Sequence, residues 1–83
     1  MSSWYVYMLR CGDDSLYSGI TTDVERRVHE HNTDNKKGAK YTRVRRPVVL
    51  VYKKRCKDRS SAAVKEAALK KLSRREKENL LDK

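Results

Sequence analysis

The sequence predicts a small α/β protein, an α+β sandwich in which one sheet is covered by helices, with the element order ββαβαα. Three segments are rich in aromatic and β-branched residues, as strands are. Three further segments are preceded by residues of the helix-capping type. The 83 residues are enough for a single domain, 1–83, with a thin core.

The strands are expected at 4–10 (WYVYMLR), 16–22 (LYSGITT) and 47–54 (PVVLVYKK). The first two should form a hairpin, because the residues between them, CGDDS at 11–15, favour a turn. Pro47 stands at the first position of the third strand, where proline is tolerated.

The register of the hairpin decides which side chains meet. Tyr5 and Tyr7 share a face of the strand. If the turn centres on Gly12, Tyr7 pairs with Tyr17 and Gly19 lies opposite Tyr5; a slip of one residue is the alternative. The missing side chain at Gly19 would let a substrate backbone approach closely.

A helix followed by a long loop is expected after the hairpin. Thr22 and Glu25 have the spacing of a capping box, so the helix should begin near Asp23 and run to about Asn32. Residues 33–46 then form a polar, basic loop, and a loop of that length in a small domain is usually functional or disordered.

Two helices follow the third strand. The residues DRSS should cap a helix from about Ser61 to Leu72. Ser73 and Glu76 form another capping box, which predicts a short last helix that ends near Leu81.

The charge of the chain points to a polyanionic partner. There are 21 Lys and Arg against 11 Asp and Glu, a formal net charge of +10, and residues 36–57 contain ten basic side chains and no acid. Such an excess gathers polyanions, of which nucleic acid is the first candidate. An anionic membrane is the weaker candidate, because the basic run has no amphipathic helical pattern. A merely solubilising basic surface is the third alternative.

Several other classes are disfavoured. No run of about 18 apolar residues is present, and the N-terminal segment has no basic region typical of a signal peptide. Cys11 and Cys56 fit no metal-binding spacing, so free thiols in a reducing cytoplasm are expected. Nucleotide-loop, dinucleotide and zinc-finger motifs are absent.

The first predicted helix carries charge on its inward face. The stripe at helical spacing is Val24, Arg27, Val28 and His31. One alternative is that the aliphatic part of Arg27 packs on the sheet and its guanidinium reaches solvent. The other is that its planar guanidinium binds a phosphate. His31 alone is more typical of a satisfied semi-buried residue.

Glu66 is the one acid between Asp58 and Glu76 and lies on a face of small and apolar residues. A carboxylate in that setting needs a partner. An ion pair with Arg27 or with Lys70 four residues on would satisfy it. The functional alternative is an oxygen ligand for Mg²⁺, which proteins commonly hold with one or two carboxylates and waters.

Together these residues resemble the GIY-YIG nuclease superfamily. The two motifs that name it match in weakened form, as Tyr5-Val6-Tyr7 and Tyr17-Ser18-Gly19, with a short turn between them. The phrases GITTDVERR and KGAKYTR are similar to those of the small stand-alone bacterial GIY-YIG proteins, and this resemblance covers nearly the whole chain. The nuclease domains of eukaryotic structure-specific endonucleases and, more distantly, of the bacterial nucleotide-excision nuclease are also similar.

The resemblance implies a three-stranded antiparallel sheet flanked by helices, and phosphodiester hydrolysis with one divalent metal. Glu66 would bind Mg²⁺ or Mn²⁺, and Arg27 would stabilise the charge that develops on the scissile phosphate. Tyr7 and Tyr17 would orient or deprotonate the attacking water, and the resemblance leaves open which tyrosine has which role. His31 matches a position that some members use near the phosphate.

The chain departs from the family pattern at three positions. Tyr5 replaces the glycine of the first motif, and Ser18 occupies the middle of the second. Ile20 stands where the excision nuclease carries a lysine. These changes leave the metal and arginine positions intact and put proton transfer in question.

Specificity is expected to depend on the basic loop 33–46. Its candidate nucleic-acid-binding residues are Lys36, Lys37, Lys40, Tyr41, Arg43, Arg45 and Arg46. Tyr41 stands among cations and could stack on an unpaired base.

Two functions follow from the sequence. The first is a metal-dependent endonuclease that nicks branched, flapped or single-stranded DNA in repair or recombination, with RNA as the less favoured substrate. The second is a catalytically weak or inactive GIY-YIG-type module that binds nucleic acid, or a protein partner that supplies specificity. The Tyr7, Tyr17, Arg27 and Glu66 set favours the enzyme, because a pure binder has no need of a carboxylate that repels phosphate.

Overall fold

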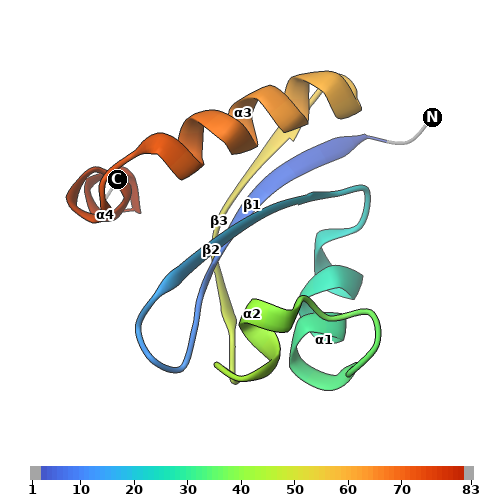
Figure 1. Cartoon of the computed structure of the whole chain (residues 1–83). Helices are drawn as coiled ribbons and strands as arrows, with labels where there is room; N and C mark the ends of the chain where they lie inside the picture. The colour runs from blue at the N-terminus through green and yellow to red at the C-terminus, as the bar shows by residue number, and fades with distance from the viewer. Residues whose placement is uncertain (1–2, 82–83) are drawn as a thin grey trace.

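The sheet is antiparallel and has three strands in the spatial order β2-β1-β3 (Figure 1). In this computed structural model, which describes residues 3–81, the strands are β1 (Trp4–Arg10), β2 (Leu16–Thr21) and β3 (Val49–Cys56). β1 lies in the centre, so β2 and β3 form the two edges. The sheet and the fold class predicted from the sequence are confirmed.

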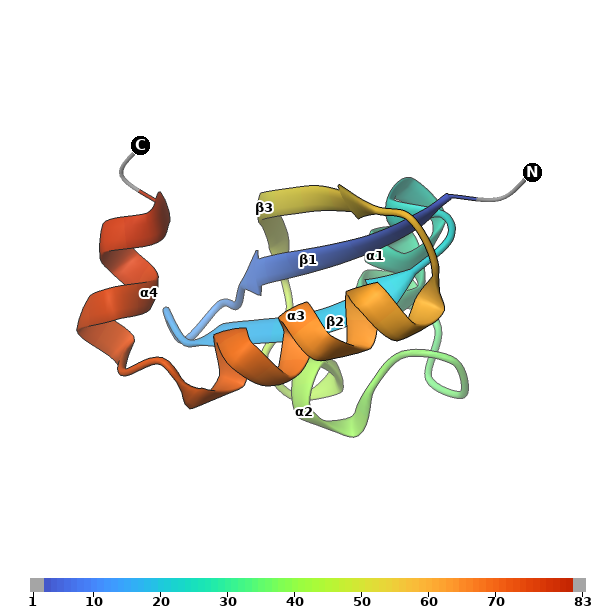
Figure 2. The same ribbon diagram turned by 90° about the horizontal axis from the view of Figure 1, so that it is seen from above.

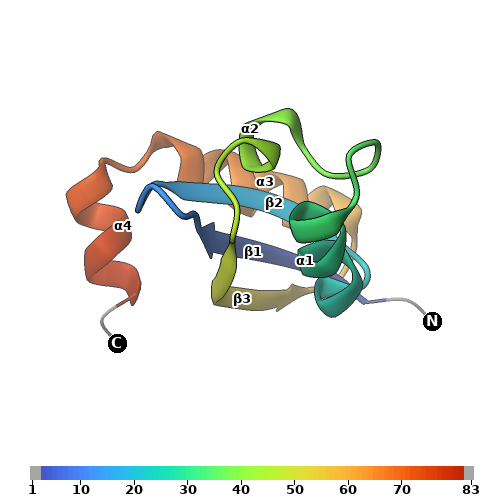
Figure 3. The ribbon, with the colours of Figure 1, turned by 90° about the horizontal axis from the view of Figure 1, so that it is seen from below.

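The helices lie on both faces of this sheet. They are α1 (Val24–Thr33), α2 (Lys40–Arg43), α3 (Arg59–Lys71) and α4 (Arg74–Leu81). α3 runs across one face (Figure 2), and α1 and α2 lie against the other (Figure 3). Within residues 3–81, none of these helices has the length and apolar character needed to cross a membrane.

Successive side chains of β1 point to opposite faces of the sheet, and this divides the apolar core into two clusters. Val6 and Met8 point toward α3 and pack against Ala62 and Leu69. Tyr7 and its neighbours on the opposite face form the second apolar cluster, whose buried members are Tyr7, Leu9, Cys11 and Val48. A side chain of β1 therefore reaches either α3 or α1, but not both.

The hairpin register differs from the predicted one by two residues. Tyr7 lies opposite Gly19, and Leu9 lies opposite Tyr17. The turn spans 11–15, where the Cys11 amide donates to the Ser15 carbonyl at 2.8 Å. The shift has a steric reason: a Cβ at position 19 would lie 2.5 Å from the Tyr7 hydroxyl, so the ring needs a glycine opposite it.

Two predicted helix starts are wrong by one or two residues. Asp23, not Thr22, is the N-cap of α1, and its carboxylate accepts the Arg26 amide at 3.1 Å. α3 begins at Arg59, because Asp58 accepts the Ser61 amide at 2.8 Å. In both cases the aspartate satisfies an amide that the first turn leaves unpaired.

The capping box at the start of α4 is confirmed. The Ser73 hydroxyl accepts the Glu76 amide at 3.2 Å, and the Glu76 carboxylate accepts the Ser73 amide at 3.0 Å. Both bonds close the first turn of α4 without help from another element.

The segment predicted as a loop, 33–46, contains α2. Arg46 holds the C-terminal end of this segment in place. The Arg46 guanidinium donates to the His31 carbonyl at 2.7 Å, to Asn35 Oδ1 at 3.0 Å and to the Asp34 carbonyl at 3.1 Å. These bonds tie the segment to the C-terminal end of α1.

Candidate active site

Four of the five predicted catalytic residues lie on the α1 face of the sheet. Tyr7 comes from β1 and Tyr17 from β2, while Arg27 and His31 come from α1. Glu66 comes from α3, on the other face, and packs near the edge strand β2. Burial is the main cause of the raised pKa of Tyr7 and of Tyr17, and the charge of Glu66 adds to it.

Tyr7 is buried, and its hydroxyl contacts His31. The side chain is 1% exposed, and its Oη lies 2.9 Å from His31 Nε2. Burial raises the pKa of Tyr7 to about 12, and the neighbouring Tyr17 adds to this effect. Tyr7 is therefore a neutral phenol at pH 7.

His31 connects Tyr7 to α2. Its Nδ1 lies 2.7 Å from Thr42 Oγ1, and the Thr42 hydroxyl donates to the Ala39 carbonyl at 3.0 Å. In the tautomer that keeps the bond from Thr42 to Ala39, Nδ1–H donates to Thr42 and Nε2 accepts from the Tyr7 hydroxyl. The Ala39 amide lies 3.4 Å from Nδ1, and only the other tautomer lets Nδ1 accept from it. Burial, and then the charge of Arg27, lowers the pKa of His31 to about 4, so the ring is neutral at pH 7.

Tyr17 is less buried than Tyr7 and sits between two aromatic rings. The His31 ring meets it edge-on at 5.2 Å between centroids, and the Tyr41 ring stacks on it at 5.8 Å. Burial raises the pKa of Tyr17, and the charge of Arg27 opposes this rise. Tyr17 is thus the phenol of the pair that solvent reaches more easily.

Arg27 lies at the rim of this cluster with a quarter of its side chain exposed. Its Nη1 donates to Glu30 Oε1 at 3.1 Å and to the Lys37 carbonyl. The guanidinium also interacts with the Tyr7 hydroxyl, and this contact raises the pKa of Arg27 and opposes the rise in the pKa of Tyr7. These contacts orient the guanidinium, and since it has five N–H groups it still has donors for an incoming oxygen.

Glu66 lines an open hollow of about 360 Å³ together with Ile20, Arg59, Ser60 and Ala63. Its nearest cation is Lys70, with Nζ 3.8 Å from Oε2, so the predicted pair at i, i+4 exists. The alternative pair with Arg27 is not formed, because Arg27 binds Glu30.

The donor set limits the kind of metal that would fit here. Across residues 3–81 there is no cluster of three or more His, Cys, Asp or Glu side chains. One carboxylate open to solvent suits a hard cation that keeps most of its waters, such as Mg²⁺ or Mn²⁺, and does not suit zinc. Glu66 is the residue that would hold it.

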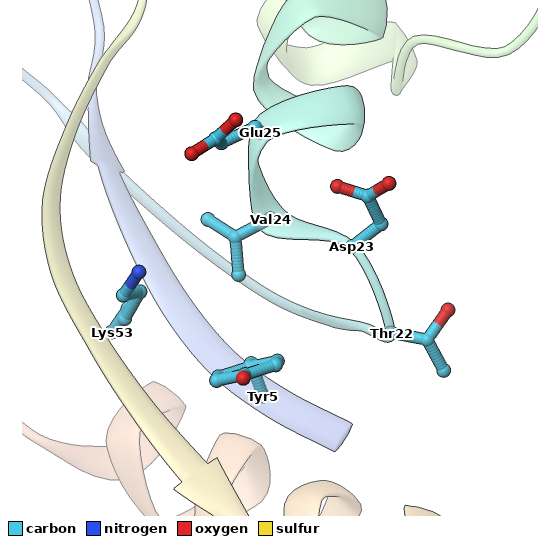
Figure 4. A pocket seen from close by; sticks show the side chains of 6 residues that line it. All are labelled: Tyr5, Thr22, Asp23, Val24, Glu25 and Lys53. Atoms are coloured by element: carbon cyan, nitrogen blue, oxygen red, sulfur yellow. The ribbon is translucent and has the colours of Figure 1, made fainter. Parts of the chain in front are cut away.

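Tyr5, which replaces the motif glycine, lies away from the cluster. Its ring lines a hollow of about 230 Å³ at the start of α1, between Lys53 and Glu25 (Figure 4). The Lys53 ammonium lies 5.9 Å from the centre of that ring. The other lining residues are Thr22, Asp23 and Val24. None of the five predicted catalytic residues borders this hollow.

The predicted nucleic-acid-binding residues divide into two groups. Lys36, Lys37, Lys40 and Arg43 are exposed. Arg45 lies 3.9 Å from the centre of the Tyr41 ring and binds Asp13 Oδ2 at 3.0 Å, and Arg46 makes the three internal bonds described above. Tyr41 thus already has Tyr17 and Arg45 against its ring, so an unpaired base would have to displace Arg45 to stack there.

Sequence reasoning missed Thr42 and Asp13. Thr42 is fully buried and orients His31, and Asp13 in the hairpin turn holds Arg45. The phrase KGAKYTR contains Thr42, but no helical or strand spacing relates position 42 to position 31. Only the folded chain brings them together.

Residues 3–79 match the family model described as the GIY-YIG catalytic domain. This chain belongs to the GIY-YIG family. It is 52% identical over 79 residues to a UPF0213 protein of Desulfotalea psychrophila, covering 95% of this chain and 71% of that one. It is 53% identical over 77 residues to a UPF0213 protein of Natronomonas pharaonis, covering 93% of this chain and 88% of that one.

Two solved structures are similar to this chain in sequence and in fold. The solution structure of a UPF0213 protein of Bacillus halodurans is 46% identical, with a TM-score of 0.61 over 96% of this chain and 83% of that one. A protein of E. faecalis is 42% identical, with a TM-score of 0.62 over 96% of this chain and 84% of that one. The resemblance stated from the motifs is confirmed, and the chain has the nuclease fold of that family.

Proposed function

We propose that this protein is a metal-dependent endonuclease that hydrolyses phosphodiester bonds in nucleic acid, with DNA as the favoured substrate. The observation that supports this most is the placement of Glu66. It is a carboxylate that lines an open hollow of about 360 Å³ together with Ile20 of the edge strand β2, in a chain with a formal net charge of +10. A surface that only bound phosphate would gain affinity by losing this charge.

The residues of the cluster have separate roles in this proposal. Arg27 binds a nonbridging oxygen of the scissile phosphate with its remaining N–H groups and stabilises the charge that develops there. Tyr17, which is closer to solvent, orients the attacking water. Tyr7 and neutral His31 receive the proton, because His31 Nε2 is already aligned with the Tyr7 hydroxyl at 2.9 Å.

Glu66 would hold a divalent cation, Mg²⁺ or Mn²⁺. When bound, the cation polarises the phosphate and stabilises the leaving oxygen. Lys70 competes for the same carboxylate at 3.8 Å, a distance typical of a weak surface pair that a divalent ion displaces easily.

The substrate is proposed to be branched, flapped or single-stranded DNA met in repair or recombination. The candidate site lies at an open edge of the sheet, and exposed cations of the loop 33–46 stand beside it: Lys36, Lys37, Lys40 and Arg43. A polyanionic strand fits this open, basic surface better than a small molecule does.

A module that binds nucleic acid without cutting it is the second candidate. The raised pKa of both phenols favours it, because a phenol with a pKa of about 12 is a poor base on its own. The two candidates differ in whether any metal condition produces cleavage.

A nicking assay separates them. Supercoiled plasmid and an end-labelled flap substrate are incubated with the protein in Mg²⁺, in Mn²⁺ and in excess chelator. The proposal predicts nicked plasmid and a discrete flap product that require metal and disappear with chelator. Binding to both substrates without product in any condition would support the second candidate.

A further inference from the structure

We propose that Arg74 and Lys77 of α4, together with Tyr41, form a second phosphate-binding subsite that holds the backbone of the strand whose scissile phosphate lies at the candidate active site. This inference rests on the proposed function to the extent that the ligand is nucleic acid. It extends the binding surface beyond the basic loop 33–46 to a helix that contributes none of the predicted binding residues.

The subsite is a hollow of about 190 Å³ where the hairpin turn, α2 and α4 meet. Its lining residues are Ser15, Leu16, Tyr41, Arg74 and Lys77. Two of them are cations and none is a carboxylate. Asp14 and Glu78 pair with Arg74 from outside the lining, so the positive charge of the hollow comes mainly from Lys77. A hydroxyl and an aromatic ring complete a lining that suits the sugar and phosphate of a nucleotide.

Arg74 is fixed in position and still has donors to offer. Its Nη2 binds the Asp14 carbonyl at 2.6 Å, Asp14 Oδ2 at 3.1 Å and Glu78 Oε2 at 3.4 Å. All three contacts use the same nitrogen, and across residues 3–81 its Nε and Nη1 have no partner. The two carboxylates therefore orient the guanidinium without closing it to a phosphate.

Lys77 is half-buried beside the same hollow, and its ammonium pairs with no carboxylate of residues 3–81. By contrast, Lys70 one helix earlier pairs with Glu66. An ammonium that no carboxylate of the described residues pairs with is suited to bind a phosphate.

Tyr41 connects this hollow to the active site. The same ring lines the hollow and stacks on Tyr17 at 5.8 Å between centroids. A strand bound at Tyr17 would therefore reach the hollow by passing Tyr41.

The position of α4 is itself fixed against the hairpin. Arg10 binds Glu78 through two nitrogens, at 3.0 and 2.5 Å, and α4 lies beside the hairpin turn in both Figures 2 and 3. The subsite is thus formed before the ligand arrives.

The test compares Lys77→Gln with Lys54→Gln, which removes the same charge from the opposite edge strand β3. Affinity for a labelled single-stranded DNA is measured in chelator, where cutting does not interfere, over a range of salt concentrations. Lys77→Gln should weaken binding about fivefold at low salt and reduce the log–log salt slope by about 0.7, the value for one lost contact to a single strand. Lys54→Gln should leave the slope unchanged.

Equal slopes and affinities for the two variants would overturn the subsite, even if the wild type cuts DNA in the nicking assay. A specific loss in Lys77→Gln would support it, even if the wild type binds without cutting. Absence of DNA binding by the wild type would overturn both. Thermal unfolding midpoints equal to that of the wild type show that neither variant acts by unfolding the chain.

Discussion

At the scale of single residues, the hairpin uses tyrosine where a phenylalanine would fill the same volume. The hydroxyl of Tyr7 begins a buried chain of polar contacts that continues through His31 and Thr42 to the Ala39 carbonyl. No buried side-chain nitrogen or oxygen within residues 3–81 lacks a partner. The polar groups of this chain therefore satisfy one another, which removes most of the cost of burying them.

Tyr7→Phe tests whether that hydroxyl also serves the reaction. Loss of the proton-accepting pair should lower kcat by about 10²–10⁴-fold, the usual contribution of a positioned acid or base. Tyr5→Phe is the matched control, because Tyr5 lines the separate hollow of Figure 4. Single-turnover cleavage of the flap substrate measures both; equal rates for the two variants would remove Tyr7 from the chemistry.

His31 makes stability depend on pH in a defined window. Its pKa is about 4 in the folded chain against 6.5 when unperturbed, so the unfolded chain takes up the proton first as the pH falls. The contribution of His31 to the free energy of unfolding is therefore fully present above about pH 6.5 and is lost between pH 6.5 and 4, about 3 kcal/mol in total.

Urea unfolding from pH 7 to pH 4.5 measures this loss. Most of the change in stability that comes from protonation of carboxylates occurs below that pH range. His31→Gln should flatten the profile, and His29→Gln, at an exposed position of the same helix, should leave it as in the wild type. A wild-type profile that is flat over this range would contradict the buried, neutral His31.

Residue patterns predicted part of this site. The stripe at helical spacing placed Arg27 and His31 on the inner side of α1, and His31 is fully buried. The pairing of Tyr7 with Gly19 was not predicted, because turn composition alone does not specify how many residues the turn consumes. The contact between His31 and Thr42 spans a segment without periodicity, so no pattern encodes it.

At the scale of elements, short polar interactions decide where helices begin and where they dock. Aspartate caps start α1 and α3, and a capping box starts α4. These starts were predictable to within two residues, because each depends on neighbours in sequence. α2 was not predictable: it has four residues and no side-chain cap, and contacts with α1 hold it.

α4 depends on ion pairs with the hairpin as well as on its apolar residues. Glu78 binds Arg10 through both carboxylate oxygens and also contacts Arg74. None of the residues of α4 is fully buried. Glu78→Gln should therefore increase hydrogen exchange of α4 amides while those of α3 and β1 remain as in the wild type. Unchanged α4 exchange would mean that Leu80 and Leu81 suffice to hold the helix.

At the scale of the whole molecule, the fold places charged and phenolic side chains from both faces of the sheet at one edge. The two helical layers leave β2 at an open edge, with the phenols and Arg27 on one side and Glu66 on the other. The motifs predicted the fold, which is confirmed, and the polyanionic partner inferred from composition stays a prediction. The meeting of side chains from both faces at this edge required the folded chain.

The most direct test of the central claim separates cutting from binding at Glu66. Glu66→Gln removes the proposed metal ligand with little change of shape, and Glu25→Gln, an exposed position in the first turn of α1, removes the same charge elsewhere. Cleavage of the flap substrate in Mg²⁺ and its affinity in chelator are measured for both variants and the wild type.

We predict that Glu66→Gln loses cleavage by at least about 10³-fold while its affinity in chelator is equal to or tighter than that of the wild type, and that Glu25→Gln cuts normally. Cleavage by Glu66→Gln at the wild-type rate would contradict the account.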